Sequence, residues 1–135
     1  MKYILDTDTI IYFLKGDKDI VSMFISSNAD MLFTTRINYA ELIFGAYNSS
    51  KIKENLRIIK EFLSKLKIFE FDEDSADIFG KIKSKLRSNG NIIADMDLMV
   101  AAISVRNDGM LITNNTRNFK RITELKIDNW KNAKY

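Results

Sequence analysis

Cysteine and histidine are both absent from the sequence, and each absence excludes a class of site. Without cysteine there can be no disulfide and no thiolate metal site, so a reducing cytoplasm is the expected compartment. Without histidine, imidazole can serve neither as a general base nor as a metal ligand. Any bound metal must therefore be held by oxygen atoms, which favours Mg²⁺ or Mn²⁺ over zinc.

Long apolar runs and linkers are missing as well. No uncharged stretch approaches the roughly 20 residues that a membrane span needs. The apolar N-terminus is interrupted by Asp6 and Asp8, unlike a signal peptide. Proline is absent, glycine is scarce and no repeat divides the chain. We expect one domain over residues 1–135 with no membrane partner.

The charge is nearly balanced, with 21 basic and 18 acidic residues and a formal net charge of +3. If several of the acids gather in one pocket, the surface outside it is clearly basic. An acidic pocket in a basic surface suits a metal-dependent enzyme that acts on nucleic acid.

Short apolar runs alternate with stretches of helical periodicity along the chain. Strands are predicted at residues 3–5, 31–34, 68–71, 110–113 and 125–127. Helices are predicted directly after Asp6, at 17–26, at 36–48 with Thr35 as N-cap, at 51–66, from Asp72 or Asp74 to Ser88, at 96–106 and at 116–122. This alternation predicts an α/β fold with a parallel sheet covered on both faces.

Asp6 stands at the end of the first predicted strand, and Asp8 follows at once. Ligands of open α/β sheets bind at the carboxyl ends of the strands, so Asp6 is a candidate for chemistry. A helix cap is an equal alternative for an aspartate in this place. We interpret Asp8 as a cap for the following helix.

Glu41 is harder to explain as a structural residue. Between Ile37 and Tyr47 the only strongly polar side chains are Asn38 and Glu41, so this helix has hardly any solvent face. A carboxylate on a buried helix costs several kcal/mol unless a cation or several donors compensate it. Glu41 is therefore a candidate site residue.

Asp95 and Asp97 open an apolar helix that runs to Arg106. An aspartate at this position stabilises a helix through its free N–H groups and its dipole, which would explain one of them. Two acids are more than capping requires, and we favour Asp97, then Asp95, as functional.

Polar side chains also follow the fourth predicted strand. Thr113, Asn114 and Asn115 stand at its carboxyl end, where a helix cap or an Asx-turn is the competing explanation. If these elements form one parallel sheet, the acids and amides converge at one edge. Carboxylates in such proximity repel one another, and a divalent cation relieves the repulsion.

Four motifs carry a resemblance to a known family. They are residues 4–8 (Ile-Leu-Asp-Thr-Asp), 40–45 (Ala-Glu-Leu-Ile-Phe-Gly), 95–102 (Asp-Met-Asp-Leu-Met-Val-Ala-Ala) and 111–119 (Leu-Ile-Thr-Asn-Asn-Thr-Arg-Asn-Phe). In this order and spacing, the chain resembles a PIN-domain endoribonuclease of the VapC toxin type over its full length.

The resemblance implies a fold and an activity. The fold would be a three-layer α/β/α sandwich with a central, mainly parallel sheet of four to five strands. The activity would be Mg²⁺- or Mn²⁺-dependent hydrolysis of RNA phosphodiester bonds by the toxin of a type II toxin–antitoxin pair, which inhibits translation. A VapB-type antitoxin, a homodimer and a structured RNA substrate such as tRNA are the implied partners.

The resemblance also implies roles for individual residues. Asp6, Glu41 and Asp97 would ligate the metal, with Asp95 as an accessory ligand. Many PIN domains have a fourth acid where this chain has Asn115, which leaves a second metal in doubt. Asn115, with Thr113, would contact the phosphate or the metal's waters.

Two other interpretations stay open at this point. Asp6-x-Asp8 imitates the nucleophile motif of haloacid-dehalogenase-type phosphatases, in which the first aspartate is phosphorylated, although Ile10 departs from that motif. A PIN-like module that binds RNA or a partner without cutting is the non-enzymatic alternative. Retention of Asp6, Glu41 and Asp97 together argues against it, because buried acids without a function could be lost at a gain in stability.

Overall fold

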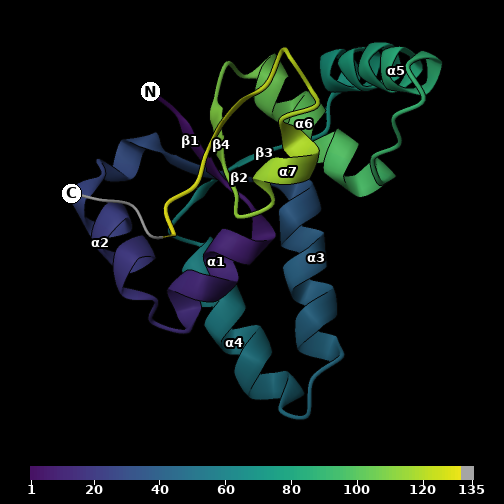
Figure 1. The fold of residues 1–135 in the computed structure, drawn as a ribbon. Coiled ribbons are helices and arrows are strands. Elements are labelled where there is room, and N and C mark those ends of the chain that lie inside the picture. Colours follow the sequence, from purple (N-terminus) through teal and green to yellow (C-terminus); the bar gives the residue numbers. More distant parts are fainter. Residues whose placement is uncertain (132–135) are drawn as a thin grey trace.

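A parallel β-sheet forms the middle layer of the protein, whose computed structural model describes residues 1–131 (Figure 1). Its strands are β1 (Tyr3–Leu5), β2 (Leu32–Thr35), β3 (Lys67–Phe69), β4 (Met110–Ile112) and β5 (Lys126–Asp128), and they lie in the order β3-β2-β1-β4-β5. Each neighbouring pair is parallel, with Ile4 of β1 opposite Phe33 of β2 and Leu111 of β4.

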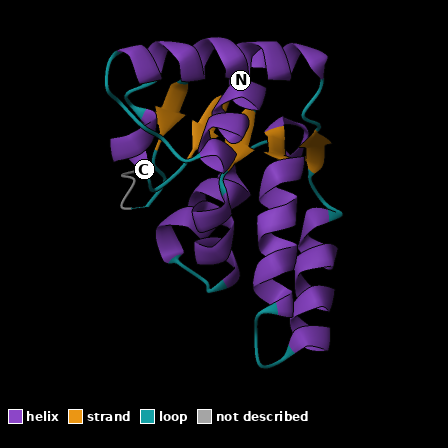
Figure 2. Ribbon diagram, turned by 90° about the vertical axis from the view of Figure 1, so that its right-hand side faces the viewer, coloured by secondary structure: helices purple, strands orange, loops and turns teal. Residues whose placement is uncertain are grey.

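Helices cover both faces of this sheet (Figure 2). The helices are α1 (Thr7–Leu14), α2 (Lys18–Ser26), the short 3-10 helix η1 (Ala29–Met31), α3 (Arg36–Tyr47), α4 (Ile52–Leu63), α5 (Glu73–Ser88), α6 (Asp95–Arg106) and α7 (Thr116–Phe119). α1 to α4 pack on one face, and α5, α6 and α7 pack on the other. The predicted three-layer α/β/α sandwich is confirmed.

The alternation of side chains along each strand explains why there are two cores. In β1, Ile4 packs with α5 and α6, whereas its neighbour Leu5 packs with α1 to α4. Leu111 and Ile112 of β4 divide between the two cores in the same way. Successive residues of a strand point to opposite faces, so a sheet buried on both sides needs continuous apolar runs.

Four of the seven α-helices in residues 1–131 begin with a side-chain cap, namely α1, α2, α3 and α5. Thr35 caps α3 by accepting from the N–H of Asn38, and Asp72 caps α5 by accepting from the N–H of Ser75. The prediction that Asp8 caps α1 is wrong, because Asp8 lies in the first turn; the N-cap is Asp6, for which a cap was the alternative. A cap must have a non-helical backbone, which Asp6 has and which a residue within the turn does not.

The chain order predicts a ligand site at the carboxyl end of the central strand β1. From β1 the chain runs to β2 and β3 on one side, and then crosses to β4 and β5 on the other. The strand order reverses between β1 and β4, and ligands of open α/β sheets bind outside such a reversal. Among residues 1–131, no helix is long and apolar enough to cross a membrane.

Candidate active site

Asp6 lies at the point where the strand order reverses, directly after β1. Its side chain is buried, at 7% exposure, and three hydrogen bonds hold it. The N–H of Thr7 and Nδ2 of Asn38 donate to Oδ1 at 3.0 and 2.9 Å, and Oγ1 of Thr113 donates to Oδ2 at 2.7 Å. The carboxylate therefore has a fixed orientation, and it is both a helix cap and a candidate ligand.

Burial dominates the protonation of this carboxyl group. It raises the pKa of Asp6 from its ordinary value of 3.8 to about 7, and the nearby charge of Asp8 acts in the same direction. The hydrogen bonds from Thr113, Thr7 and Asn38 oppose this shift without cancelling it. Ionised Asp6 is thus unfavourable in the protein alone, and a cation next to it would reverse that preference.

The side chain of Glu41, from α3, is linked to the residues after β1 by the hydroxyl group of Thr7. Oγ1 of Thr7 donates to its Oε1 at 2.8 Å. Half-burial raises the pKa of Glu41, and the charges of Asp97 and Asp8 raise it further. The helix thus brings Glu41 next to the acids that follow β1 and open α6.

Asn38 connects the two carboxylates, and the sequence did not single it out. It is fully buried, and its Nδ2 lies 2.9 Å from Asp6 Oδ1, 3.0 Å from Thr7 Oγ1 and 3.5 Å from Glu41 Oε1. Its Oδ1 accepts from the hydroxyl of Thr35 at 2.7 Å. A signal was present in the sequence, because Asn38 and Glu41 are three residues apart and so share one face of an apolar helix.

The two acids at the start of α6 have different surroundings. Asp97 is half-buried, and both burial and the charge of Asp8 raise its pKa. Asp95 forms an ion pair with Lys83 of α5 at 2.8 Å, and its side chain is 61% exposed. The predicted accessory ligand Asp95 is thus directed to α5, away from the other acids.

Asp8 belongs with the acids instead. It is half-buried, and burial raises its pKa. Its charge in turn raises the pKa of Asp6, Glu41 and Asp97. We refer to Asp6, Asp8, Glu41 and Asp97 as the acid cluster.

The loop after β4 closes the other side of the acid cluster. Thr113 is fully buried, and its hydroxyl donates to Asp6 and accepts from the N–H of Asn115 at 3.0 Å. The predicted contact between Thr113 and a phosphate does not match this position, because the hydroxyl is buried and engaged. Asn115 is half-buried and caps α7 without a side-chain hydrogen bond, so its amide is available to a ligand.

The chemistry of the acid cluster fits a hydrated divalent cation. Every charge that raises the pKa of its members belongs to another of its acids. Within residues 1–131, no group of three or more acidic side chains is placed so that it could hold a metal ion directly. Mg²⁺ usually keeps several waters and takes only one or two carboxylates, so these oxygen donors suit it.

The sequence of this chain is similar to those of known proteins. Residues 3–125 match the PIN domain family. The chain is 37% identical over 132 residues to Ribonuclease VapC2 of Haemophilus influenzae, a match that covers 96% of this chain and 98% of that protein. It is 29% identical over 130 residues to the tRNA(fMet)-specific endonuclease VapC of Salmonella typhimurium, with 96% and 98% coverage.

A solved structure agrees over the same length. It is the crystal structure of VapBC2 from Rickettsia felis bound to a DNA fragment from its promoter. The matching chain there has a TM-score of 0.90 and 30% identity to this one, with 96% of this chain and 99% of that chain covered.

Proposed function

This chain belongs to the PIN-domain family, in which it is a relative of the VapC ribonucleases, and we propose that it is an endoribonuclease that requires Mg²⁺ or Mn²⁺. The observation that carries the proposal is the acid cluster at the carboxyl end of β1, with Asp6, Glu41 and Asp97 brought together from three separate segments. The haloacid-dehalogenase-type phosphatase is not retained, because the chain matches a different family over residues 3–125.

The positions of the acids suggest different roles in the reaction. Asp6 and Asp97 would hold the cation, and Glu41 would ligate it or orient the attacking water. A bound Mg²⁺ or Mn²⁺ supplies a Lewis acid that lowers the pKa of water and neutralises charge that builds up on the phosphate. Burial raises the pKa of Glu41, which makes its carboxylate a stronger base towards that water.

Neighbouring polar groups keep these acids in position. Asn38 and Thr113 fix the two oxygens of Asp6, and Thr7 fixes one oxygen of Glu41. Held donors and acceptors do not have to reorganise during the reaction, which is a large part of what an enzyme contributes. We assign the remaining phosphate contact to the free amide of Asn115.

The substrate class follows from the relatives and from charge. Outside the acid cluster, bases outnumber acids in the chain, which favours a polyanion. The Salmonella typhimurium relative is named as specific for tRNA(fMet). We propose a structured RNA, with tRNA as the first to test, so that cleavage in the cytoplasm would inhibit translation.

An antitoxin of the VapB type is the proposed partner. A groove of about 570 Å³ lies between α1, α3 and α4, lined by Ile11, Leu14, Leu42, Ala46 and Ile59, with Glu41 at its edge. An apolar segment in this groove would reach the acid cluster and block it. The homodimer implied by the resemblance stays a prediction, which light scattering on the purified protein would test.

Sequencing of cleaved RNA tests the proposed function. Brief expression in a bacterial host should create new RNA ends at defined positions, and an Asp6→Asn variant expressed to the same level should not create them. The Asn side chain keeps the size and one acceptor oxygen but removes the negative charge. Identical RNA ends with both proteins would contradict the assignment of Asp6.

The antitoxin needs a separate test. A small neighbouring gene whose product abolishes the growth inhibition caused by expression of this chain would identify the antitoxin.

A further inference from the structure

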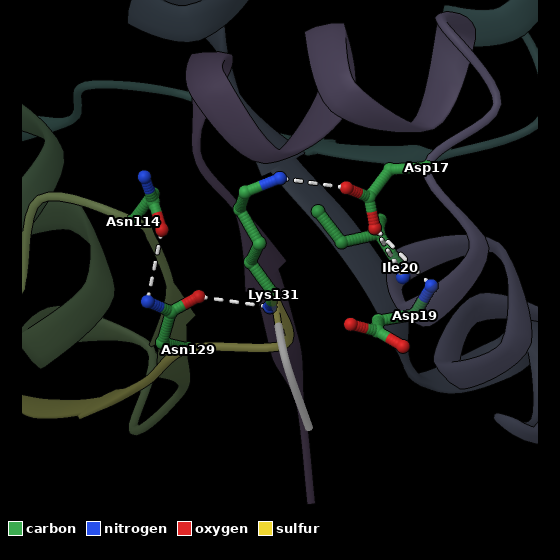
Figure 3. A network of polar contacts seen from close by, with 6 residues as sticks. All are labelled: Asp17, Asp19, Ile20, Asn114, Asn129 and Lys131. Atoms are coloured by element: carbon green, nitrogen blue, oxygen red, sulfur yellow. Dashed lines mark hydrogen bonds and ion pairs between the residues drawn. The ribbon is translucent and has the colours of Figure 1, made fainter. Parts of the chain in front are cut away.

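Asn129 follows the last strand, β5, and neither the sequence motifs nor the proposed reaction gives it a role. Its Nδ2 donates to Oδ1 of Asn114 at 2.9 Å, as Figure 3 shows. Its own Oδ1 accepts from the N–H of Lys131 at 2.9 Å. Because the oxygen is engaged with Lys131, the amide nitrogen is fixed on the side that faces Asn114.

Asn114 belongs to the loop between β4 and α7, which lies against the acid cluster. The hydroxyl of Thr113 donates to Oδ2 of Asp6 at 2.7 Å, and the N–H of Asn114 lies 3.1 Å from Oδ2 of Asp8. The next residue, Asn115, carries the amide that we assign to the phosphate. A shift of this loop would therefore change both the orientation of Asp6 and the place of the Asn115 amide.

Two hydrogen bonds tie this loop to the segment that follows it in the sheet. The N–H of Thr113 donates to the backbone oxygen of Asp128 at 3.0 Å, which extends the pairing of β4 with β5 by one residue. One residue further along each segment, the contact continues through side chains, from Asn129 to Asn114. It is the only hydrogen bond of the Asn114 side chain within residues 1–131.

The segment after β5 is anchored independently of this contact. Trp130 is 1% exposed and packs in the core that faces α1 to α4. Nζ of Lys131 forms an ion pair with Asp17, the cap of α2, at 2.8 Å. These two contacts hold the segment whether or not Asn129 reaches Asn114, so the consequence of the amide contact falls on the loop.

We propose that Asn129 is a positioning residue for RNA cleavage, and that it acts through the side chain of Asn114. It holds the loop of residues 113–115 in the place where Thr113 orients Asp6. This inference rests on the proposed function, and it adds to the site a residue from the end of the sheet that supports the loop from behind.

Steady-state cleavage of RNA by Asn129→Ala tests this role. We expect kcat to fall by at least about tenfold, because small displacements at the reacting centre are costly, and KM to stay within about twofold. The matched control is Asn107→Ala at the other end of β4, where Nδ2 of Asn107 donates to the backbone oxygen of Ile103 at 2.7 Å. The control should keep the wild-type kcat. Rates are compared at a temperature at which melting curves show every variant fully folded.

A double-mutant cycle tests whether Asn129 acts through Asn114. Asn114→Ala keeps the backbone N–H and removes only the side chain that Asn129 holds. In this background, Asn129→Ala should cause no further loss of kcat, because the two side chains share one contact. The same tenfold loss in both backgrounds would overturn the inference and make Asn129 a residue that stabilises the C-terminal segment.

The conservative variant Asn129→Asp should rescue the rate. It keeps one oxygen for the N–H of Lys131 and presents the other to Asn114, whose amide can turn to donate its Nδ2. We expect its kcat to return to within about twofold of the wild type. A kcat as low as that of Asn129→Ala would count against the inference.

Failure of the inference and failure of the proposed function give different results. If the wild type cleaves no RNA with Mn²⁺, the proposed function fails and the inference with it. Cleavage by the wild type together with an unchanged kcat in Asn129→Ala overturns the inference alone.

Discussion

One amide group, that of Asn38, lies between Asp6 and Glu41. Its Nδ2 is 2.9 Å from Asp6 Oδ1 and 3.5 Å from Glu41 Oε1, and its side chain is fully buried. A single residue of α3 thereby sets the relative position of two carboxylates that come from different parts of the chain.

Replacement of Asn38 should therefore affect both stability and activity. Asn38→Ala removes one of the two donors to Asp6 Oδ1 and leaves the buried hydroxyl of Thr35 without its acceptor, which costs about 1–3 kcal/mol of unfolding free energy. We also expect RNA cleavage to fall by at least about tenfold, since a misplaced carboxylate acts poorly. Denaturant unfolding and a cleavage assay measure the two effects.

Asn55→Ala is the matched control for this variant. Asn55 also donates from an amide to a hydroxyl, that of Ser49 at 2.9 Å, but it lies in α4. This control should keep wild-type cleavage. Wild-type cleavage by Asn38→Ala would show that the amide serves stability alone.

Thr113 should behave as a positioning residue. Thr113→Val keeps the shape but removes the hydroxyl that donates to Asp6 and accepts from Asn115. The control is Thr34→Val, because Thr34 is equally buried and its hydroxyl donates only to the backbone oxygen of Leu5. Both variants should lose about 1–3 kcal/mol of stability. Only Thr113→Val should also lose cleavage and Mn²⁺ affinity, and equal losses in the two would refute a special role.

The pH dependence of stability without metal should carry the signature of Asp6. Its pKa is about 7 in the folded protein against an ordinary 3.8, so the folded state binds the extra proton between these values. The stability that the folded protein gains by binding this proton is fully present below pH 3.8, and it is lost as the pH rises towards 7. A gap of this size corresponds to on the order of 4 kcal/mol.

The measurement is the free energy of unfolding in EDTA as a function of pH. The wild type should lose stability between acidic and neutral pH relative to Asp6→Asn, whose side chain does not titrate. Parallel curves for the two proteins would mean that Asp6 is not the buried, proton-binding group that the geometry indicates.

The strands and the layers could be predicted from the sequence, while the role of Asp6, Glu41 and Asp97 as metal ligands stays a prediction. Glu41 stood out because an acid on an apolar helix has few structural explanations, and Asp6 stood out because it directly follows a buried strand. The alternation of short strands and helices sufficed for the parallel sheet, and its central strands β1 and β4 are continuous apolar runs, as a sheet covered on both faces requires.

The choice between neighbouring acids could not be predicted. Residues two apart on a helix point about 200° apart, so Asp95 and Asp97 cannot face the same pocket. Asp95 pairs with Lys83 of α5, a contact between helices that the sequence does not reveal. Asp8 was misjudged for a related reason: its partner, the N–H of Asn114, is more than a hundred residues away along the chain.

The central claim is that a cation-dependent ribonuclease site forms where Asp6, Glu41 and Asp97 meet. Its most direct test is cleavage of a labelled tRNA by purified wild type, Asp97→Asn and Asp95→Asn, each with Mn²⁺ and with EDTA. We predict cleavage by the wild type and Asp95→Asn with Mn²⁺, none with EDTA, and a loss of at least about a hundredfold in Asp97→Asn. Undiminished cleavage by Asp97→Asn, or cleavage by the wild type in EDTA, would contradict the account.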